Sequence, residues 1–375
     1  MLKLRFPLPV FRSAKEIVNG QNARMALKGL VANRVALIVS SAFKRSSYCE
    51  QLERLINADS VLLIEKSWDG EPSVESLSGV LCKLEKFQPD YILALGGGSV
   101  IDGAKLAWLL YEHPTLSNEQ LFRPFSLPSL RGKAKFAAIP TTVGAGSEVS
   151  SAAVMLDTSS SSKKAVVTHE FIPDLVILDP ELVQEVSHNI LKTTVADALS
   201  HAVEGYVSQI NHPLMDSFAE KAVEIVASYI DCFDDESWDL AMIADLQYAS
   251  MLAGWVQNHK IVGLSHAIAH QLGSLEIGHG LANGLLMPEV ISFNAGKDKE
   301  TAKKYQKLCS KASIENVSQL RDIFKKLTKG QYDSKCLSEA DLERIATGAL
   351  LDPAAKSNPV TFSEIDVKEI VIKCL

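Results

Sequence analysis

The pattern of apolar and polar positions changes character near the middle of the chain. In the first half, short apolar runs rich in β-branched residues alternate with amphipathic stretches such as 47–57 and 73–87. The runs are Val35–Val39, Val61–Ile64, Tyr91–Leu95, Phe136–Ile139 and Leu175–Leu178. Continuously apolar strands that alternate with helices are typical of a parallel sheet covered on both faces. Segment 156–169, which has a polar centre, predicts a hairpin.

Helical periodicity dominates from about residue 183 to the end of the chain. Apolar residues there recur every three or four positions, and β-branched runs are few. The predicted helices are 191–209, 214–232, 238–258, 260–273, 301–312, 317–328 and 339–350. The change falls near Asp179–Pro180. We therefore expect two domains, a Rossmann-like α/β dinucleotide-binding domain with a parallel sheet at 1–180 and an all-α domain at 181–375.

The composition narrows the class of protein. The chain has 375 residues, 47% of them hydrophobic and 22% charged, as in ordinary globular proteins. A net charge of −7 argues against binding to nucleic acid or to an anionic membrane surface, and no apolar run is long enough to span a bilayer. The six cysteines contain no CxxC pair, which fits a reducing compartment. We expect a cytoplasmic protein with no nucleic-acid or membrane partner.

Two loops rich in small residues follow predicted strands. In "YILALGGGSVIDGAK", Gly96, Gly97 and Gly98 allow a ligand to approach the backbone, and Ser99 is placed to cap the helix that begins near Val100. The free N–H groups of such a helix end favour a phosphate. The sequence is not the GxGxxG fingerprint, and by itself it is equally compatible with a plain strand–helix turn.

The second loop strengthens the case for a nucleotide. "IPTTVGAGSEVSS", residues 139–151, offers the hydroxyls of Thr141, Thr142 and Ser147 beside two glycines. Two loops of this kind at strand ends of one sheet favour a dinucleotide more than either loop does alone.

Histidines concentrate in the second half, where six of the nine lie between 201 and 279. In "ADALSHAVEG", Asp197 and His201 are one helical turn apart on one face, and His266 and His270 repeat this spacing. His279 follows in a glycine-flanked segment that predicts a turn. Any one of them could be an ordinary core or surface histidine. Together, one carboxylate and three imidazoles suit Fe²⁺, Zn²⁺ or another borderline divalent metal rather than Mg²⁺ or Ca²⁺, and leave His270 for proton transfer.

With these motifs in place, the chain resembles the iron-containing (group III) alcohol dehydrogenase family over nearly its whole length. "GGGSVIDGAK", "PTTVGAGSE", "DALSHAVE", "SHAIAHQLG" and "HGLANGLLMPEVISFN" are similar to ordered motifs of that family. The resemblance implies a dehydroquinate synthase-like fold and a homo-oligomer, commonly a dimer. Near the end, the family's Asn-Pro-Arg is replaced by Asn358-Pro359-Val360.

The resemblance also implies roles for individual residues. It implies that Asp197, His201, His266 and His279 bind the metal and that His270 lies near the nicotinamide and the substrate. The implied cofactor contacts are Gly96, Gly97, Gly98, Ser99, Asp102, Thr141, Thr142, Ser147, Lys163, Leu182 and the position of Ser41.

The chain departs from the family pattern at two places. Ser41 stands where NAD-preferring members carry an acid, and Lys44 and Arg45 could pair with a 2′-phosphate or be solvated loop charges, so both NAD and NADP are candidates. Gln257, His259 and Lys260 stand where many members of the family have Phe, Asn and a small residue, before the third ligand position. They either favour a polar or anionic substrate or lie at the surface.

The function that we expect is reversible hydride transfer between a small alcohol and NAD(P), with the metal polarising the substrate oxygen, so that the aldehyde or ketone is the product. Fe²⁺ is the metal that the resemblance favours, and Zn²⁺ suits the same ligands. The alternatives are a glycerol dehydrogenase-like or dehydroquinate synthase-like enzyme and a non-catalytic nucleotide-binding protein.

Overall fold

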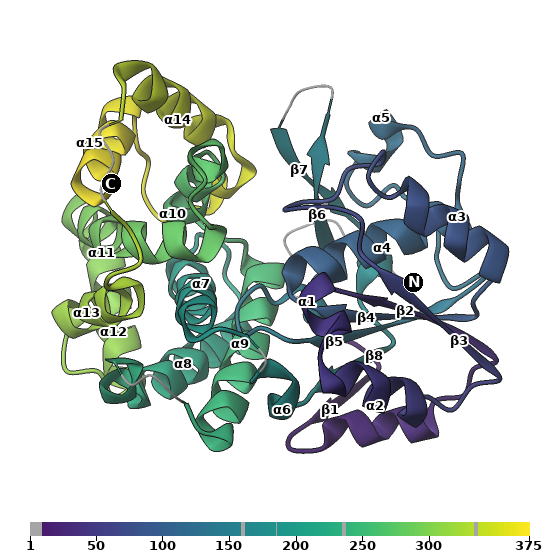
Figure 1. Ribbon diagram of the computed structural model, residues 1–375. Coiled ribbons are helices and arrows are strands. Elements are labelled where there is room, and N and C mark those ends of the chain that lie inside the picture. Colours follow the sequence, from purple (N-terminus) through teal and green to yellow (C-terminus); the bar gives the residue numbers. More distant parts are fainter. Residues whose placement is uncertain (1–9, 159–161, 185, 235–237, 334–336) are drawn as a thin grey trace. The chain divides into compact units, whose positions relative to one another are not determined.

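The computed structural model describes residues 10–158, 162–184, 186–234, 238–333 and 337–375. They divide into two compact units, one of Arg12–Val186 and one of Ser187–Leu375 together with Val10 and Phe11. The first unit contains a parallel sheet with helices, and the second is helical (Figure 1). The predicted fold class is confirmed.

The first unit is built on a six-stranded sheet in which every neighbouring pair is parallel, in the order β1-β8-β5-β4-β2-β3. The strands are β1 (Glu16–Asn19), β2 (Arg34–Val39), β3 (Ser60–Glu65), β4 (Tyr91–Gly96), β5 (Lys135–Pro140) and β8 (Leu175–Leu178). Each apolar run in the sequence forms one of these strands. Only β1 was not predicted, because its four residues, "EIVN", form too short and too polar a run.

Alternate residues of the strands enter two separate cores. Ile92 and Ala94 of β4 face a core formed with α3 (Ser78–Phe87) and α4 (Gly98–Glu112). Leu93 and Leu95 face the opposite core, which includes residues of α2 (Ser47–Leu55). The helices cover both faces of the sheet (Figure 1), which explains why β4 is buried along its whole length.

Shorter elements complete this unit. The predicted hairpin is present as antiparallel β6 (Ala152–Asp157) and β7 (Ser162–Val167), and its tip, 159–161, lies outside the described residues. The remaining helices are α1 (Ser41–Lys44), α5 (Asn118–Leu121), α6 (Pro180–Val183) and the 3₁₀ helices η1 (Ala23–Gly29), η2 (Ser147–Val149) and η3 (His169–Phe171).

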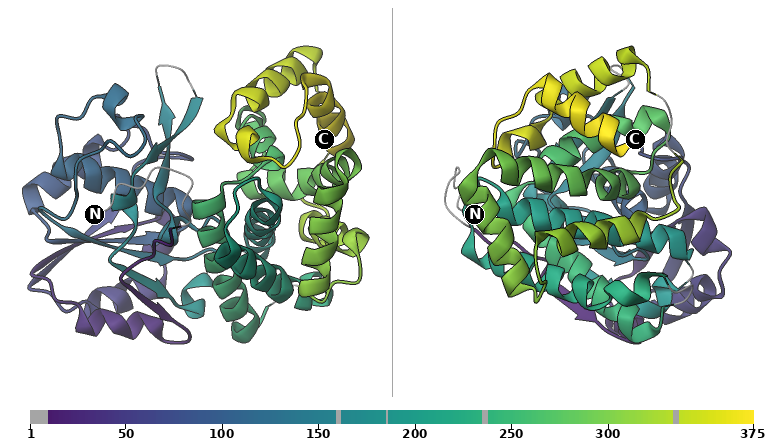
Figure 2. Two further views of the ribbon diagram at one scale, coloured as in Figure 1. Left: turned by 180° about the vertical axis from the view of Figure 1, so that it is seen from behind. Right: turned by 90° about the vertical axis from the view of Figure 1, so that its left-hand side faces the viewer.

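The second unit packs around α7 (His188–Val207), which contacts α8 (Pro213–Ser228), α9 (Leu240–Lys260), α11 (His279–Lys297), α12 (Lys299–Lys311) and α13 (Val317–Thr328). The other helices are α10 (Leu264–Ala269), α14 (Glu339–Leu351), α15 (Glu364–Cys374) and the 3₁₀ helices η4 (Ile230–Asp234), η5 (Leu272–Leu275) and η6 (Pro353–Ser357). Figure 2 shows α14 and α15 in yellow at one end of this unit. Within the described part of the chain, no helix combines the length and apolarity that crossing a bilayer requires.

The longest helix that the sequence analysis did not predict is α11. Its sequence, "HGLANGLLMPEVISFNAGK", contains several glycines and Pro288, which argue against a helix. Tertiary packing accounts for one of these glycines: a Cβ at Gly284 would lie 2.5 Å from Thr328 Cγ2 and 2.9 Å from Ala196 Cβ. Glycine is therefore needed at 284, because Thr328 and Ala196 lie too close to the helix for a larger residue. The predicted helix at 260–273 is instead split into the end of α9, α10 and the start of η5.

A pair of glycine substitutions tests the packing of α4 against the sheet edge. A Cβ at Gly103 would lie 2.1 Å from Cζ2 of the buried Trp68 ring, whereas a Cβ at Gly79 in α3 would meet no atom within 4 Å. We expect Gly103→Ala to destabilise the protein by about 1–3 kcal/mol through overpacking. Gly79→Ala should stabilise it by about 0.5–1 kcal/mol, because alanine is the better helix former. Urea unfolding measures both, and a Gly103→Ala protein as stable as the wild type would contradict the packing described here.

Candidate metal centre and nucleotide-binding loops

Four side chains from three helices meet around one carboxylate oxygen in the helical unit. Asp197 Oδ1 lies 4.0 Å from His201 Nε2 on the same helix, α7. It lies 3.7 Å from His266 Nε2 of α10 and 3.6 Å from His279 Nε2 of α11. One ligand atom from each of Asp197, His201 and His266 lies within 4.8 Å of the others. These three side chains are therefore close enough to share a single cation, whereas His279 approaches Asp197 without lying within 4.8 Å of all three.

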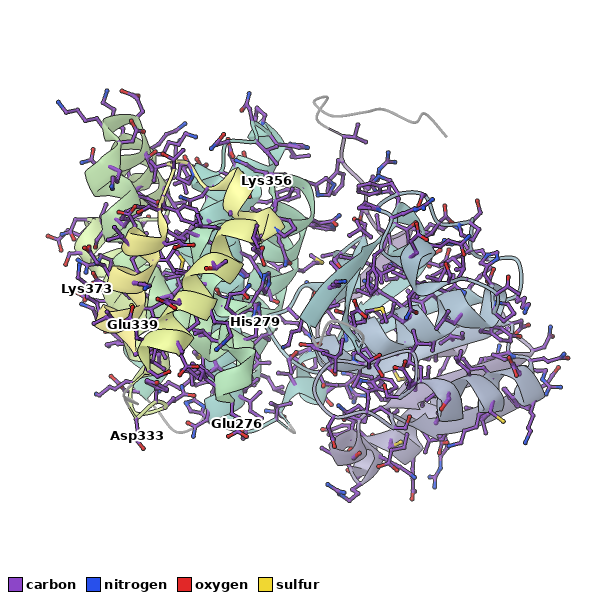
Figure 3. The ribbon with its side chains drawn as sticks, turned by 90° about the horizontal axis from the view of Figure 1, so that it is seen from above. Glu276, His279, Asp333, Glu339, Lys356 and Lys373 are labelled. Carbon is purple, nitrogen blue, oxygen red and sulfur yellow. The ribbon has the colours of Figure 1, made fainter. Side chains whose placement is uncertain are left out.

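His279 reaches the cluster because α11 begins unusually close to α7. It is the first residue of α11, after the N-cap Gly278, and not part of a turn as the glycines around it suggested. The next residue, Gly280, packs so closely on α7 that a Cβ there would lie 2.4 Å from Thr193 O. Figure 3 labels His279 at this helix start. Glycine at 280 thus allows the approach that brings this imidazole to Asp197.

The cluster is buried on one side and open on the other. Asp197, His201 and His266 are each at most 5% exposed, whereas the His279 side chain is 37% exposed. Catalytic metal sites differ from structural ones in keeping an accessible coordination position. The exposed side at His279 is where a substrate oxygen could enter.

Electrostatics favours the ionised form of Asp197 and the neutral form of His279, but the protonated form of His266. Burial would raise the pKa of Asp197, but the surrounding histidines outweigh it and hold that pKa below its usual range. Desolvation within the cluster, together with repulsion from the other imidazoles, lowers the pKa of His279. For His266, burial is outweighed by the carboxylates of Asp197 and Glu204, which raise its pKa to about 9. Metal binding would therefore displace a proton from His266.

The donor chemistry fits a borderline divalent cation. His266 Nε2 is buried, and no hydrogen-bond partner for it lies within the described ranges, whereas its Nδ1 is 2.6 Å from Glu204 Oε2. Asp197 Oδ1 also accepts a hydrogen bond of 2.9 Å from Asn283 Nδ2. One carboxylate and three imidazoles, supported by a second layer of polar partners, are typical of iron and zinc sites.

His270 lies beside the cluster and does not join it. Its ring stacks on that of His279, with centroids 5.4 Å apart and planes 8° apart. Its Nδ1 is 2.8 Å from Asp352 Oδ2, and its side chain is 35% exposed. The orientation given by Asp352 leaves Nε2 as the nitrogen that can exchange a proton.

In the α/β unit, the two glycine loops pack against each other at the ends of β4 and β5. A Cβ at Gly98 would lie 2.7 Å from Ala145 Cβ, and one at Gly97 would lie 3.2 Å from Thr142 Cγ2. Thr141 N also donates to Gly96 O at 3.1 Å. The N-cap of α4 is Gly97, and no side chain caps this helix end. Its first N–H groups, at a loop without side chains, suit a phosphate.

Ser99 does not cap α4, which corrects the expectation from the sequence. It lies inside the first turn of the helix, where its Oγ donates to Gly70 O and accepts from Trp68 Nε1 at 3.2 Å. The glycine at position 97 forms the cap because the helix begins two residues earlier than predicted.

Asp102 connects α4 to β6, and Lys105 connects it to the second loop. Asp102 Oδ2 accepts from Val154 N at 2.9 Å, while its Oδ1 is buried and has no hydrogen-bond partner among the residues that the structure describes. The fully buried Lys105 Nζ donates to Ser147 O at 2.6 Å and to Ser150 O at 2.9 Å. Burial lowers the pKa of Lys105 to about 8, against the attraction of nearby carboxylates. Both loops are therefore held by one helix.

The other predicted cofactor residues are placed as follows. Ser41 is the first residue of α1, after the end of β2. Lys163, in β7, forms an ion pair of 3.0 Å with Glu71. Leu182, in α6, is fully buried in the core that contains Ile177. Of the two loop cations, Lys44 pairs with Glu65 at 2.9 Å.

The expectation that Lys260 lies at the surface is wrong. Its side chain is 2% exposed and forms an ion pair with Asp216 of α8. His259 is occupied too, since its Nδ1 lies 2.8 Å from Trp255 O and its ring stacks on Phe11. Lys260 is an internal connection between helices.

Several supporting residues were not recognised from the sequence. Glu204, Asn283 and Asp352 each contact a side chain of the cluster or its neighbour, and Lys105 holds the second loop. A signal existed for Glu204, which follows Asp197 by seven residues and therefore lies on the same face of α7. Asn283 has the same relation to His279, at a spacing of four. Asp352 gave no such signal, because it is far from His270 in the sequence.

Comparison with known proteins assigns the family. The profile described as "Iron-containing alcohol dehydrogenase" matches residues 14–180, and the one described as "Fe-containing alcohol dehydrogenase family, C-terminal" matches residues 191–375. The NADPH-dependent butanol dehydrogenase of Clostridium saccharobutylicum is 30% identical over 98% of this chain and 97% of that protein. A 1-propanol dehydrogenase of Citrobacter freundii is 34% identical over 79% of this chain and 76% of that protein.

Solved structures agree with this assignment. The iron-containing alcohol dehydrogenase of Thermococcus thioreducens matches with a TM-score of 0.87 and 28% identity, over 97% of this chain and 99% of that one. The iron-containing alcohol dehydrogenase of Thermotoga maritima shares the fold, with a TM-score of 0.83 and 24% identity, over 98% of this chain and 99% of that one. The chain belongs to the iron-containing alcohol dehydrogenase family.

Proposed function

We propose that this protein is a metal-dependent, NAD(P)-linked oxidoreductase that interconverts a small alcohol and its aldehyde or ketone. The observation that carries the proposal is the convergence of Asp197, His201, His266 and His279 around one carboxylate oxygen, with the fourth side chain partly exposed. The names of the relatives, a butanol and a 1-propanol dehydrogenase, support short primary alcohols as substrates.

In this proposal, the four side chains of the cluster hold Fe²⁺, and Zn²⁺ is the alternative for the same ligands. When bound, the metal supplies Lewis acidity that lowers the pKa of an alcohol hydroxyl. Glu204 and Asn283 hold His266 and Asp197 by hydrogen bonds of 2.6 and 2.9 Å. The ligands thus keep one arrangement while substrates exchange on the exposed side.

The cofactor is NAD or NADP, and it supplies the hydride acceptor. Gly96, Gly97, Gly98 and Ser99 at the start of α4 would hold the pyrophosphate, with the unpartnered Oδ1 of Asp102 and the hydroxyls of Thr141, Thr142 and Ser147 nearby in the sequence or in the second loop. Ser41, Lys44 and Arg45 follow β2, the strand beside β4, where the adenosine 2′ position is expected in folds of this type. Lys163 and Leu182 are proposed as further contacts.

His270 is proposed to relay the proton that the alcohol releases. Its Nδ1 is held by Asp352 at 2.8 Å, and its partly exposed ring stacks on His279. An imidazole fixed by a carboxylate on one nitrogen can pass protons through the other. This residue would act on the proton and not on the metal.

The proposal extends to the domains, the location and the assembly of the protein. The nucleotide-binding and metal-binding domains are taken as 1–180 and 181–375, and the protein as a cytoplasmic homodimer. The two family profiles end and begin on either side of that boundary, and the cysteine pattern fits a reducing compartment.

The first test is removal of one metal ligand. His266→Ala should lower both the metal content and the rate of alcohol-dependent NAD(P) reduction at 340 nm by more than about 100-fold, since even second-layer partners of a metal are worth 10–100-fold. His113→Ala, which removes an imidazole bonded to Ser129 O in the other unit, is the control and should retain metal and activity. Short primary alcohols with NAD and with NADP, in enzyme reconstituted with Fe²⁺ or Zn²⁺, form the assay panel.

Two outcomes would contradict the proposal. A metal-free His266→Ala protein with wild-type turnover would show that the cluster is not the catalytic centre. Tight nucleotide binding without turnover of any alcohol, with either cofactor and either metal, would favour the non-catalytic alternative.

The second test concerns the contact between the two glycine loops. In Gly98→Ala the new Cβ would lie 2.7 Å from Ala145 Cβ, so the loops must move apart. We expect the Kd for NADH and NADPH, measured by fluorescence titration, to rise about tenfold or more, which corresponds to about 1.4 kcal/mol.

The double variant Gly98→Ala/Ala145→Gly is the matched control, because it keeps the added methyl group and removes the one that it meets. It should recover most of the affinity. An unchanged Kd in the single variant would indicate that nucleotides bind elsewhere.

A further inference from the structure

Glu204 is almost completely buried, and its carboxylate accepts hydrogen bonds from His266 and from the backbone just before it. It is 2% exposed. Its Oε1 accepts from Ser265 N at 2.6 Å, and its Oε2 accepts from Gly263 N at 3.0 Å and from His266 Nδ1 at 2.6 Å. The side chain crosses from α7 to the first turn of α10, so it connects the helix that carries Asp197 and His201 with the one that carries His266.

This contact determines which nitrogen of His266 carries the proton in the neutral ring. A carboxylate oxygen only accepts hydrogen bonds, so Nδ1 must be the protonated nitrogen. The lone pair then belongs to Nε2, the atom that is 3.7 Å from Asp197 Oδ1. In neutral imidazole, the hydrogen bond at one nitrogen sets the ligating state of the other.

The same segment also reaches Asp197. Ser265, whose N–H binds Glu204, directs its Oγ to Asn283 Oδ1 at 3.0 Å. Asn283 Nδ2 in turn donates to Asp197 Oδ1 at 2.9 Å. A change in Glu204 therefore has a route to two members of the cluster, through His266 directly and through Ser265 and Asn283.

We propose that Glu204 is a positioning residue of the metal centre, which fixes His266 in the tautomer and orientation that place Nε2 toward the metal. The inference rests on the proposed function of the cluster as a metal site. It assigns to Glu204 a role in metal affinity that a simple support for the chain before α10 would not have.

Asn358 provides the comparison that separates the two roles. Its Oδ1 accepts from Leu264 N at 3.2 Å, between the two N–H groups that bind Glu204. It is 1% exposed and bonds further to Asn294, but it makes no hydrogen bond to His266 among the described contacts. Asn358 thus supports the same stretch of backbone without touching the imidazole.

The experiment compares Glu204→Gln with Asn358→Ala in the full-length protein. The glutamine has the shape of glutamate, but its NH₂ must face either Ser265 N–H or the pair formed by Gly263 N–H and His266 Nδ1. In either orientation, the amide donor of the glutamine faces at least one donor of the neighbouring segment. Affinity for Co²⁺ is measured by competition with a chromophoric chelator, and the visible spectrum of bound Co²⁺ reports the ligand field.

We expect Glu204→Gln to weaken Co²⁺ binding by about 10–100-fold and to alter the spectrum. Asn358→Ala should lower the melting temperature but leave the Co²⁺ affinity within about threefold of wild type. Wild-type affinity in Glu204→Gln, or an equal loss in both variants, would overturn the proposal. If Glu204→Gln does not fold, Glu204→Asp, which keeps the charge but retracts it by one methylene, should show the same preferential loss of affinity.

A second readout does not depend on the metal. In metal-free protein with ¹⁵N-labelled histidine, at a pH above 9 where the His266 ring is neutral, the ring signals of His266, identified by their absence in His266→Ala, should show the Nδ1-protonated form in the wild type and in Asn358→Ala. Glu204→Gln should shift the balance toward Nε2 protonation or remove the preference. A wild-type protein that binds no divalent metal would refute the proposed function, whereas an unchanged tautomer in Glu204→Gln would refute the role of Glu204.

Discussion

The requirement that buried polar groups be partnered governs the helical unit. Asp197, His201 and Glu204 project from one side of α7, a helix whose residues from 195 to 207 are all buried. A buried donor or acceptor left without a partner costs about 1–3 kcal/mol, and a charged one costs more. The surrounding helices must therefore present partners at fixed positions, and they do so with the backbone before α10, with His266 and with Asn283. The geometry of the candidate metal centre follows from this accounting.

In both units, glycines allow neighbouring segments of the backbone to lie unusually close together. In the helical unit, Gly280 and Gly284 bring α11 against α7, and in the α/β unit Gly97 and Gly98 bring one loop against the other. Removing side chains at these positions exposes backbone and allows a ligand or a neighbouring helix to occupy the space. Lys105 then satisfies the carbonyl groups that the second loop turns inward. Glycines thus permit close packing, and Lys105 stabilises the second loop by hydrogen bonds.

The sequence predicted five of the six strands of the parallel sheet, because burial on both faces makes their central residues apolar. It also grouped Asp197, His201, His266 and His279 as one set of candidate metal ligands, although only the first two are neighbours in the sequence. α11 was missed because glycine and proline normally interrupt helices, and only the contacts with Ala196 and Thr328 show why Gly284 is tolerated. Lys260 was misjudged for the opposite reason: a lysine at the end of a helix is usually solvated, and its partner Asp216 is 44 positions away.

The ligand set and the glycine loops belong to different stretches of the chain. Asp197, His201, His266 and His279 all come from Ser187–Leu375, and both glycine loops come from Arg12–Val186. Under the proposed function, amino-acid changes that alter the choice between NAD and NADP would therefore fall in one stretch, and changes that alter the choice of metal would fall in the other. For protein engineering, the two properties are open to separate mutant libraries whose best members can afterwards be combined.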